Sequence, residues 1–275
     1  MLASRPVREA LTTSHRQRRG LLVPVANPEG VAPLIAIALA ATRPEDPPPR
    51  VLAMVNRAGE VPPEQGAAPS SGALQSAIDY ARSRGARIEA EAMWSENPAA
   101  DIVTAAHTAE IDWLLLGYHR AASGSDTMGG MVNRIFGDAR GLPINVGVFI
   151  QGTDRPIERV FAAVDGGPDG RAVLELAARI AQTQKCRMRA LLVSGRMPQA
   201  EPDDDLIELI RGAREKMGRR LHTDVLSERS LNQLFKQTPG RLLIVGRKFA
   251  EEVQFPLHET PKGDRCVIVV QGTEP

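Results

Sequence analysis

The sequence predicts an α/β protein made of two tandem domains, each an open parallel five-stranded sheet flanked by helices. Apolar segments of strand length alternate with segments of helix length along the whole chain, which is the pattern of right-handed βαβ units around a parallel sheet. The pattern begins twice, near residues 20 and 159, each time as a strand, a turn of small residues and a helix. A chain of 275 residues is long enough for two medium-sized domains.

The first half contains short apolar runs separated by longer segments with helical spacing. We expect strands at Gly20–Val25, Arg50–Val55, Ala86–Trp94, Asp112–Leu116 and Asn145–Ile150. We expect helices at Val31–Ala41, Gly72–Ser83, Pro98–Ala109 and Gly129–Ala139. Pro24 lies inside the first strand and removes a hydrogen-bond donor, so it should sit near the carboxyl end of that strand or at a bulge.

The second half repeats this order. Its expected strands are Arg159–Val164, Arg187–Val193, Leu221–Leu226, Arg241–Val245 and Cys266–Val270, and its expected helices are Arg171–Ala181, Asp204–Met217 and about Ser230–Lys236. The polar segment Gln151–Pro156, which contains Gly and Pro, predicts the boundary between the halves. The domains are therefore predicted over residues 19–152 and 156–275, after an arm of residues 1–18.

The composition favours some classes of protein over others for this chain. An aromatic share of 4% means that the cores are built from Leu, Val, Ile and Ala, which suits helices packed on parallel strands. A net charge of +1 gives no electrostatic reason to expect nucleic-acid binding. No run approaches the roughly 20 apolar residues of a membrane span. Cys186 and Cys266 have no second thiol at metal or redox spacing, so we expect both to be buried in a reduced, cytoplasmic protein.

The amino-terminal arm is basic. It contains one acidic residue, Glu9, and five arginines, which are Arg5, Arg8, Arg16, Arg18 and Arg19. The arm lacks the apolar core of a signal peptide. Two interpretations remain open: a solvated arm, or a linker that runs beneath an anionic membrane face.

A glycine-rich segment follows the fourth expected strand. The strand ends at Gly117, and the pair Gly129–Gly130 opens the next helix. Glycines let backbone amides approach an anion, and a helix start presents unpaired N–H groups and a positive dipole end. His119 and Arg120 add side-chain donors, and an arginine can hold a phosphate with two bonds. The alternative is that these glycines only allow the chain to turn. Neither a P-loop nor a GxGxxG fingerprint is present.

The spacing of these glycines resembles the nucleotide loop of the universal stress protein family: Gly, two residues, Gly, nine residues, Gly, then Ser or Thr. Gly117 and Gly130 match the outer glycines, whereas Arg120 stands at the inner glycine and Met131 at the hydroxyl residue. Asn133, two positions further on, offers a polar group instead. The resemblance extends from about residue 19 to 271 and implies a universal stress protein-like fold, of the adenine nucleotide alpha hydrolase-like kind.

This resemblance also implies where a ligand would lie. The family's strand order places a crevice between the first and fourth strands, and ligands of open parallel sheets bind at such a reversal of strand order. The base would lie against the loop after the first strand and the end of the second strand, and the phosphate against the glycine-rich segment. The predicted binding residues are Ala26, Asn27, Val55, Gly117, His119, Arg120, Gly129, Gly130, Met131, Val132 and Asn133. The implied ligand is an adenine nucleotide, AMP or ATP, with Mg²⁺ only beside a triphosphate.

The second half has the aspartate expected on the base side of the site but lacks the glycine pair expected on the phosphate side. Asp165 and Gly166 follow its first strand, where the family places an adenine-reading aspartate, although Asp165 could equally cap the following turn. After Gly246, however, no glycine pair precedes the last strand, and Glu251 and Glu252 would repel a phosphate. We therefore expect the second domain to be degenerate as a nucleotide site.

A regulatory role follows from these expectations. The segments Leu22–Pro28 and Gly117–Arg120 resemble stress-protein-like cytoplasmic domains of cation/proton antiporters and amino-acid permeases. A membrane transporter domain is thus an expected partner, with the chain in the cytoplasm at the inner face of the membrane. The family also pairs domains through the last strand, which implies a homodimer or an intramolecular pseudo-dimer.

No catalytic or metal pattern accompanies the predicted site. GxSxG, HExxH, CxxC and EF-hand patterns are absent from the sequence. We therefore expect a binding module and not an enzyme, with neither catalytic residues nor a protein metal site. Two alternatives remain open: a structural or interaction protein whose site has decayed, and slow ATP hydrolysis in the first domain.

Overall fold

The computed structural model describes residues 20–56, 71–118, 129–150, 157–164, 167–193, 204–226, 241–252 and 265–273. The strands of the first half are β1 (Leu21–Val25), β2 (Arg50–Asn56), β3 (Glu89–Ser95), β4 (Trp113–Gly117) and β5 (Asn145–Ile150). Its helices are the 3₁₀ turn η1 (Pro28–Gly30), α1 (Val31–Ala41), α2 (Gly72–Ser83), α3 (Pro98–Thr108) and α4 (Gly130–Asp138).

The second half has the same order of elements. Its strands are β6 (Arg159–Val164), β7 (Arg187–Val193), β8 (Leu221–Leu226), β9 (Arg241–Gly246) and β10 (Arg265–Gln271). Its helices are α5 (Gly167–Thr183), α6 (Asp204–Met217), the 3₁₀ turn η2 (Gly218–Arg220) and α8 (Arg247–Glu252). The helix expected at about Ser230–Lys236 lies outside the described residues.

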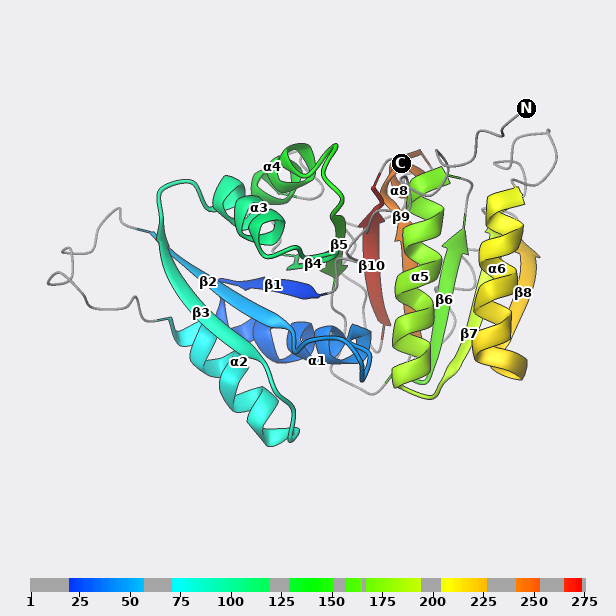
Figure 1. Ribbon diagram of the computed structural model, residues 1–275, viewed down its shortest axis with the longest axis horizontal. Helices are drawn as coiled ribbons and strands as arrows, with labels where there is room; N and C mark the ends of the chain where they lie inside the picture. The colour runs from blue at the N-terminus through cyan, green and yellow to red at the C-terminus, as the bar shows by residue number, and fades with distance from the viewer. Residues whose placement is uncertain are drawn as a thin grey trace, which may run out of the picture.

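The ten strands form one sheet in the order β3-β2-β1-β4-β5-β10-β9-β6-β7-β8 (Figure 1). Pairing is parallel within each half, and β5 and β10 pair antiparallel, from Val146 with Gln271 to Ile150 with Val267. The α/β fold class is therefore confirmed, but the two expected five-stranded sheets are joined into one ten-stranded sheet. They join because β5 and β10 are the edge strands of their halves, and each pairs with the unpaired backbone groups of the other.

Helices cover both faces of the sheet (Figure 1). Helices α1, α2, α5 and α6 follow one another on one face, whereas α3, α4 and α8 pack on the other. The run Leu114–Leu116 shows why the strands are apolar throughout: Leu115 faces the first layer, and its two neighbours face the second. Each apolar layer contains residues of both halves, so the core is continuous across the junction.

The two tryptophans differ in burial, and the expectation that both cysteines are buried was only half correct. Trp113 is fully buried, but Trp94 is half-buried because its strand, β3, is an edge of the sheet. Cys266 is buried in β10, whereas Cys186 is half-buried and precedes β7. In the described part of the chain, no helix is both long and apolar enough to cross a membrane.

A buried ion pair joins the halves at the amino-terminal edge of the sheet. Arg179 of α5 donates to Asp112 at 2.7 Å and to Glu175 at 2.5 Å. The second Asp112 oxygen accepts the backbone N–H of Gly20 at 2.8 Å, just before β1. Burial raises the pKa of Asp112 above its ordinary value, and the Arg179 guanidinium counteracts this effect. Arg179 therefore stabilises the charged form of a carboxylate that also holds the start of β1.

Replacing Arg179 by methionine should destabilise the fold strongly. The variant leaves the largely buried Asp112 carboxylate without its cation, and such a loss costs about 3–5 kcal/mol. Urea denaturation measures this change. Arg82→Met is the matched control, because Arg82 forms an exposed pair with Asp79 and its removal should cost under about 1 kcal/mol. Adding Asp112→Asn to Arg179→Met should recover stability, and equal losses in Arg82→Met and Arg179→Met would contradict the assignment.

Candidate ligand pocket

A crevice opens where β1 and β4 separate. The two strands pair only at Leu21 with Trp113 and Leu22 with Leu114, although both continue toward the carboxyl edge of the sheet. Pro24 lies in this unpaired part of β1 and has no N–H to donate. On its other side β1 remains paired with β2 up to Val25. Pro24 thus lies near the carboxyl end of its strand, as expected, and helps explain the separation.

The end of β4 is held on the opposite side. Gly117 pairs with Phe149 of β5, and the N–H of Tyr118 donates to the Phe149 carbonyl at 2.9 Å. Space at Gly117 is limited, since a Cβ there would lie 3.3 Å from Leu34 of α1. The two strand ends are therefore fixed by different neighbours, β2 and β5, and the gap between them is built into the sheet.

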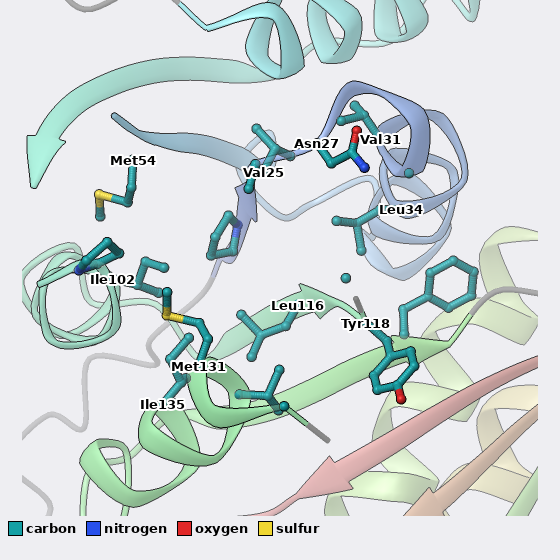
Figure 2. Close-up of a pocket in the computed structure, with 18 of the residues that line it drawn as sticks. Val25, Asn27, Val31, Leu34, Met54, Ile102, Leu116, Tyr118, Met131 and Ile135 are labelled. Carbon is teal, nitrogen blue, oxygen red and sulfur yellow. The ribbon is translucent and has the colours of Figure 1, made fainter. Parts of the chain in front are cut away.

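A cavity of about 450 Å³ occupies this gap (Figure 2). Its volume lies within the range of small-molecule sites. Val31 and Leu34 of α1 form one wall, and Ile102 of α3 with Ile135 of α4 forms the other. The remaining lining residues are Pro24, Val25, Ala26, Asn27, Gly30, Met54, Pro98, Leu116, Gly117, Tyr118, Gly129, Gly130, Met131, Val132 and Phe149. No described lining residue carries a charged side chain, so the walls suit an apolar or aromatic group.

Two polar features face the cavity. The first is the N-terminal end of α4, which starts at Gly130 and has no side-chain cap. Gly129 has a φ of 83°, a conformation that favours glycine. At Gly130, by contrast, no described atom would lie within 4 Å of an added Cβ. Among the described atoms, none therefore blocks the start of α4, whose first-turn amides can face a negatively charged group.

The second polar feature is Asn27. Its Oδ1 accepts the backbone N–H of Glu29 at 3.1 Å and so caps the turn η1. The same side chain lines the cavity. The amide nitrogen of Asn27 has no protein partner in the described chain, and it remains available to a ligand as a donor.

The structure brings most of the predicted binding residues together. Seven of them line the cavity, and these are Ala26, Asn27, Gly117, Gly129, Gly130, Met131 and Val132. Val55 does not line it, and Met54 does, because successive strand residues face opposite sides of a sheet. Asn133 lies on an exposed part of α4 outside the lining. His119 and Arg120 lie outside the described residues.

Sequence reasoning missed the apolar walls. Leu34 and Ile135 lie one turn along the two helices that begin at the site, three residues after Val31 and Val132. This i, i+3 spacing is visible in the sequence, but the same spacing also describes any core-facing helix. Ile102 and Phe149 gave no local signal, because only the folded sheet places them beside β1 and β4.

The corresponding edge of the second half is closed. β6 pairs with β9 from Arg159 as far as Ala163, so no comparable gap opens between these strands. The carboxylate of Asp169, in the first turn of α5, accepts the N–H groups of Lys248 at 3.1 Å and of Gly272 at 2.8 Å. A Cβ at Gly272 would overlap the Pro168 carbonyl oxygen. Asp165 and Gly166 lie outside the described residues.

A metal has no evident site in the described residues, where no three His, Cys, Asp or Glu side chains form a cluster. In the second half, Glu251 is paired with Arg247 at 2.8 Å. The polar chemistry of the cavity, as far as its described lining goes, comes from backbone amides and the Asn27 side chain.

Comparison with known proteins identifies the fold. No protein-family model matches the chain, and no curated protein matches it. A universal stress protein from Archaeoglobus fulgidus aligns with a TM-score of 0.54 and 14% identity, over 92% of this chain and 96% of that chain. The cytoplasmic domain of a prokaryotic cation chloride cotransporter aligns with a TM-score of 0.60 and 12% identity, over 93% and 96%.

A functionally unknown protein from Pseudomonas aeruginosa also aligns, with a TM-score of 0.53 and 13% identity over 94% of each chain. At these identities the similarity concerns the fold. The fold of this chain is therefore universal stress protein-like, and it is shared with a cytoplasmic domain of a transporter.

Replacing Asp169 by alanine should loosen the closed edge of the second half. The variant removes the acceptor of two backbone N–H groups, and loss of such a cap costs about 1–2 kcal/mol. Amide hydrogen exchange should become faster at Lys248 and Gly272. Asp138→Ala, at the exposed end of α4, is the control and should leave both amides protected. Unchanged exchange in Asp169→Ala would contradict the role assigned to this carboxylate.

Proposed function

We propose that this chain is a regulatory module that binds a purine nucleotide in the first-half pocket and acts by binding, without catalysis. One observation carries the proposal: a single cavity combines apolar walls with the uncapped N-terminal end of α4. Apolar walls suit the faces of a nucleobase, and the amides at a helix N-terminus suit a phosphate. The resemblance of the sequence to universal stress proteins and the universal stress protein-like fold support the same ligand class.

Within this proposal a monophosphate is the favoured ligand. Arg120 and Met131 depart from the family's nucleotide motif at the inner glycine and at the hydroxyl residue, which speaks against a triphosphate. AMP is the ligand that the family resemblance implies under this constraint, whereas ATP would need Mg²⁺ and further cations. Binding without catalysis is supported by the same lining, in which Asn27 and Tyr118 are the described side chains with nitrogen or oxygen atoms.

The partner that we propose is a membrane transporter. Support comes from the cotransporter cytoplasmic domain, which covers nearly the whole chain in the alignment. Cation/proton antiporters and amino-acid permeases, expected from the sequence, belong to the same broad class. In this role the chain would lie in the cytoplasm at the inner membrane face, and ligand binding in the pocket would bias the transporter. Cell fractionation tests the location, and a chain found only in a secreted fraction would contradict it.

A structural tandem domain without a ligand is the second candidate function. Two observations favour it: Arg120 and Met131 depart from the family motif, and the sheet and both core layers run without interruption across the halves. This alternative predicts that the pocket is not used, so the binding experiment below separates the two functions.

A leucine at Gly130 should weaken binding while preserving the fold. A Cβ there has no described atom within 4 Å, and leucine is a better helix former than glycine, so stability should be kept or rise. Isothermal titration with AMP, ADP and ATP should show binding tighter than millimolar in the wild-type protein. We expect Gly130→Leu to weaken it at least tenfold.

Gly137→Leu is the matched control, since Gly137 lies in the same helix, also has room for a Cβ, and is outside the lining. This variant should bind as the wild type does. Millimolar or weaker affinity of the wild type for all three nucleotides, and also for IMP, would sink the nucleotide proposal and favour the structural one. Equal binding by Gly130→Leu would place the ligand elsewhere.

A further inference from the structure

We propose that Asn27 selects the base of the ligand, and that it favours a 6-oxopurine over adenine. This inference rests on the proposed function, namely that the pocket binds a purine nucleotide. It goes further because the family resemblance implies adenine, whereas the hydrogen bonds of Asn27 point to a base that presents an oxygen atom.

The orientation of the Asn27 amide is fixed by its own backbone. Oδ1 accepts the N–H of Glu29 at 3.1 Å, and an amide nitrogen in the same place would face another donor. The oxygen therefore belongs to the turn η1, and the nitrogen is the group left for a ligand. Figure 2 shows this nitrogen on the side of Leu34, a wall residue of the pocket, with the oxygen turned away from it.

The position of Asn27 places it beside the base. A phosphate on the first-turn amides of α4 anchors one end of the nucleotide near Met131. Asn27 follows β1 and lies across the pocket from Met131 (Figure 2). The end of the ligand opposite the phosphate is the base, so the edge of the base meets the Asn27 amide nitrogen.

A donor placed opposite position 6 of the base discriminates between the two kinds of purine, because the N1 and N7 acceptors of adenine are then not its partners. The O6 atom of hypoxanthine or guanine accepts a hydrogen bond from the Asn27 nitrogen, whereas the 6-amino group of adenine is itself a donor. Two donors that face each other lose a hydrogen bond and keep the cost of desolvation. Asn27 is exposed, so water reduces the difference, and we expect a preference of about 3- to 10-fold.

Inosine and adenosine are the probes that isolate this contact, because they share the sugar, carry no charge and differ at the edge of the base. Titration of the wild-type protein should show tighter binding of inosine by that factor, and IMP and AMP should show the same order. In Asn27→Asp, one carboxylate oxygen still accepts the Glu29 N–H, while the other replaces the donor by an acceptor. Adenosine should then bind more tightly than inosine.

Asn97→Asp is the matched control. Asn97 is exposed, its side chain does not cap α3, and it adjoins the lining residue Pro98, so the variant brings the same charge close to the pocket. It should keep the wild-type preference. Thermal melting confirms that each variant is folded.

The outcomes are distinct. Adenosine binding as tightly as inosine in the wild type, or an unchanged preference in Asn27→Asp, overturns the selection by Asn27 and leaves the nucleotide proposal standing. If no nucleoside and no nucleotide binds, both proposals are overturned. A preference that reverses in Asn27→Asp and persists in Asn97→Asp supports the inference.

Discussion

Strands β5 and β10 pair antiparallel, and this ladder turns two parallel half-sheets into one sheet. Each of these strands would otherwise expose a row of unpaired backbone groups at the edge of its half. The junction also brings the helical layers together, because α1 packs against α5 and the apolar core continues beneath both. The strands that remain as edges, β3 and β8, lie at the two far ends of the sheet. The positions of the pocket and of the buried ion pair both follow from this arrangement.

The two halves share a plan but differ at the edge where a ligand would lie. In the first half, β1 leaves β4 after two residue pairs, and the gap becomes a cavity. In the second half, β6 stays paired with β9, and the Asp169 carboxylate takes up amides that a ligand could otherwise reach. An internal carboxylate costs no binding entropy, so it competes effectively with any free anion. The two halves therefore differ in strand pairing and in hydrogen bonding at this edge, as well as in their sequence motifs.

Much of the fold could be predicted from the sequence, because parallel strands buried on both faces are read as apolar runs such as Leu114–Leu116. The joining of the half-sheets leaves no local signal, since the paired strands are distant in the sequence. It was expected only from the family resemblance, as one of two ways in which the last strand pairs domains. At the pocket, glycines and turn residues such as Asn27 and Gly130 were predictable from their chemistry. The walls were not, because Ile102 and Phe149 resemble ordinary core residues until the sheet places them.

The contacts around the pocket suit a regulatory role. Helix α4, whose N-terminal end lines the pocket, contacts the second half. Arg247 lies 4.4 Å over the Phe136 ring, and Gln271 donates to the Phe136 carbonyl at 3.0 Å. The start of β4 is tied to α5 through Asp112 and Arg179. A ligand shifts a conformational equilibrium only as far as it binds one state better than another. A ligand held between α1 and α4 would contact two elements that both pack on the second half. If the ligand binds one conformation of these elements better than another, it shifts the equilibrium of both halves. The proposed regulation would therefore act through the shared sheet, because the first half forms the pocket and packs against the second half.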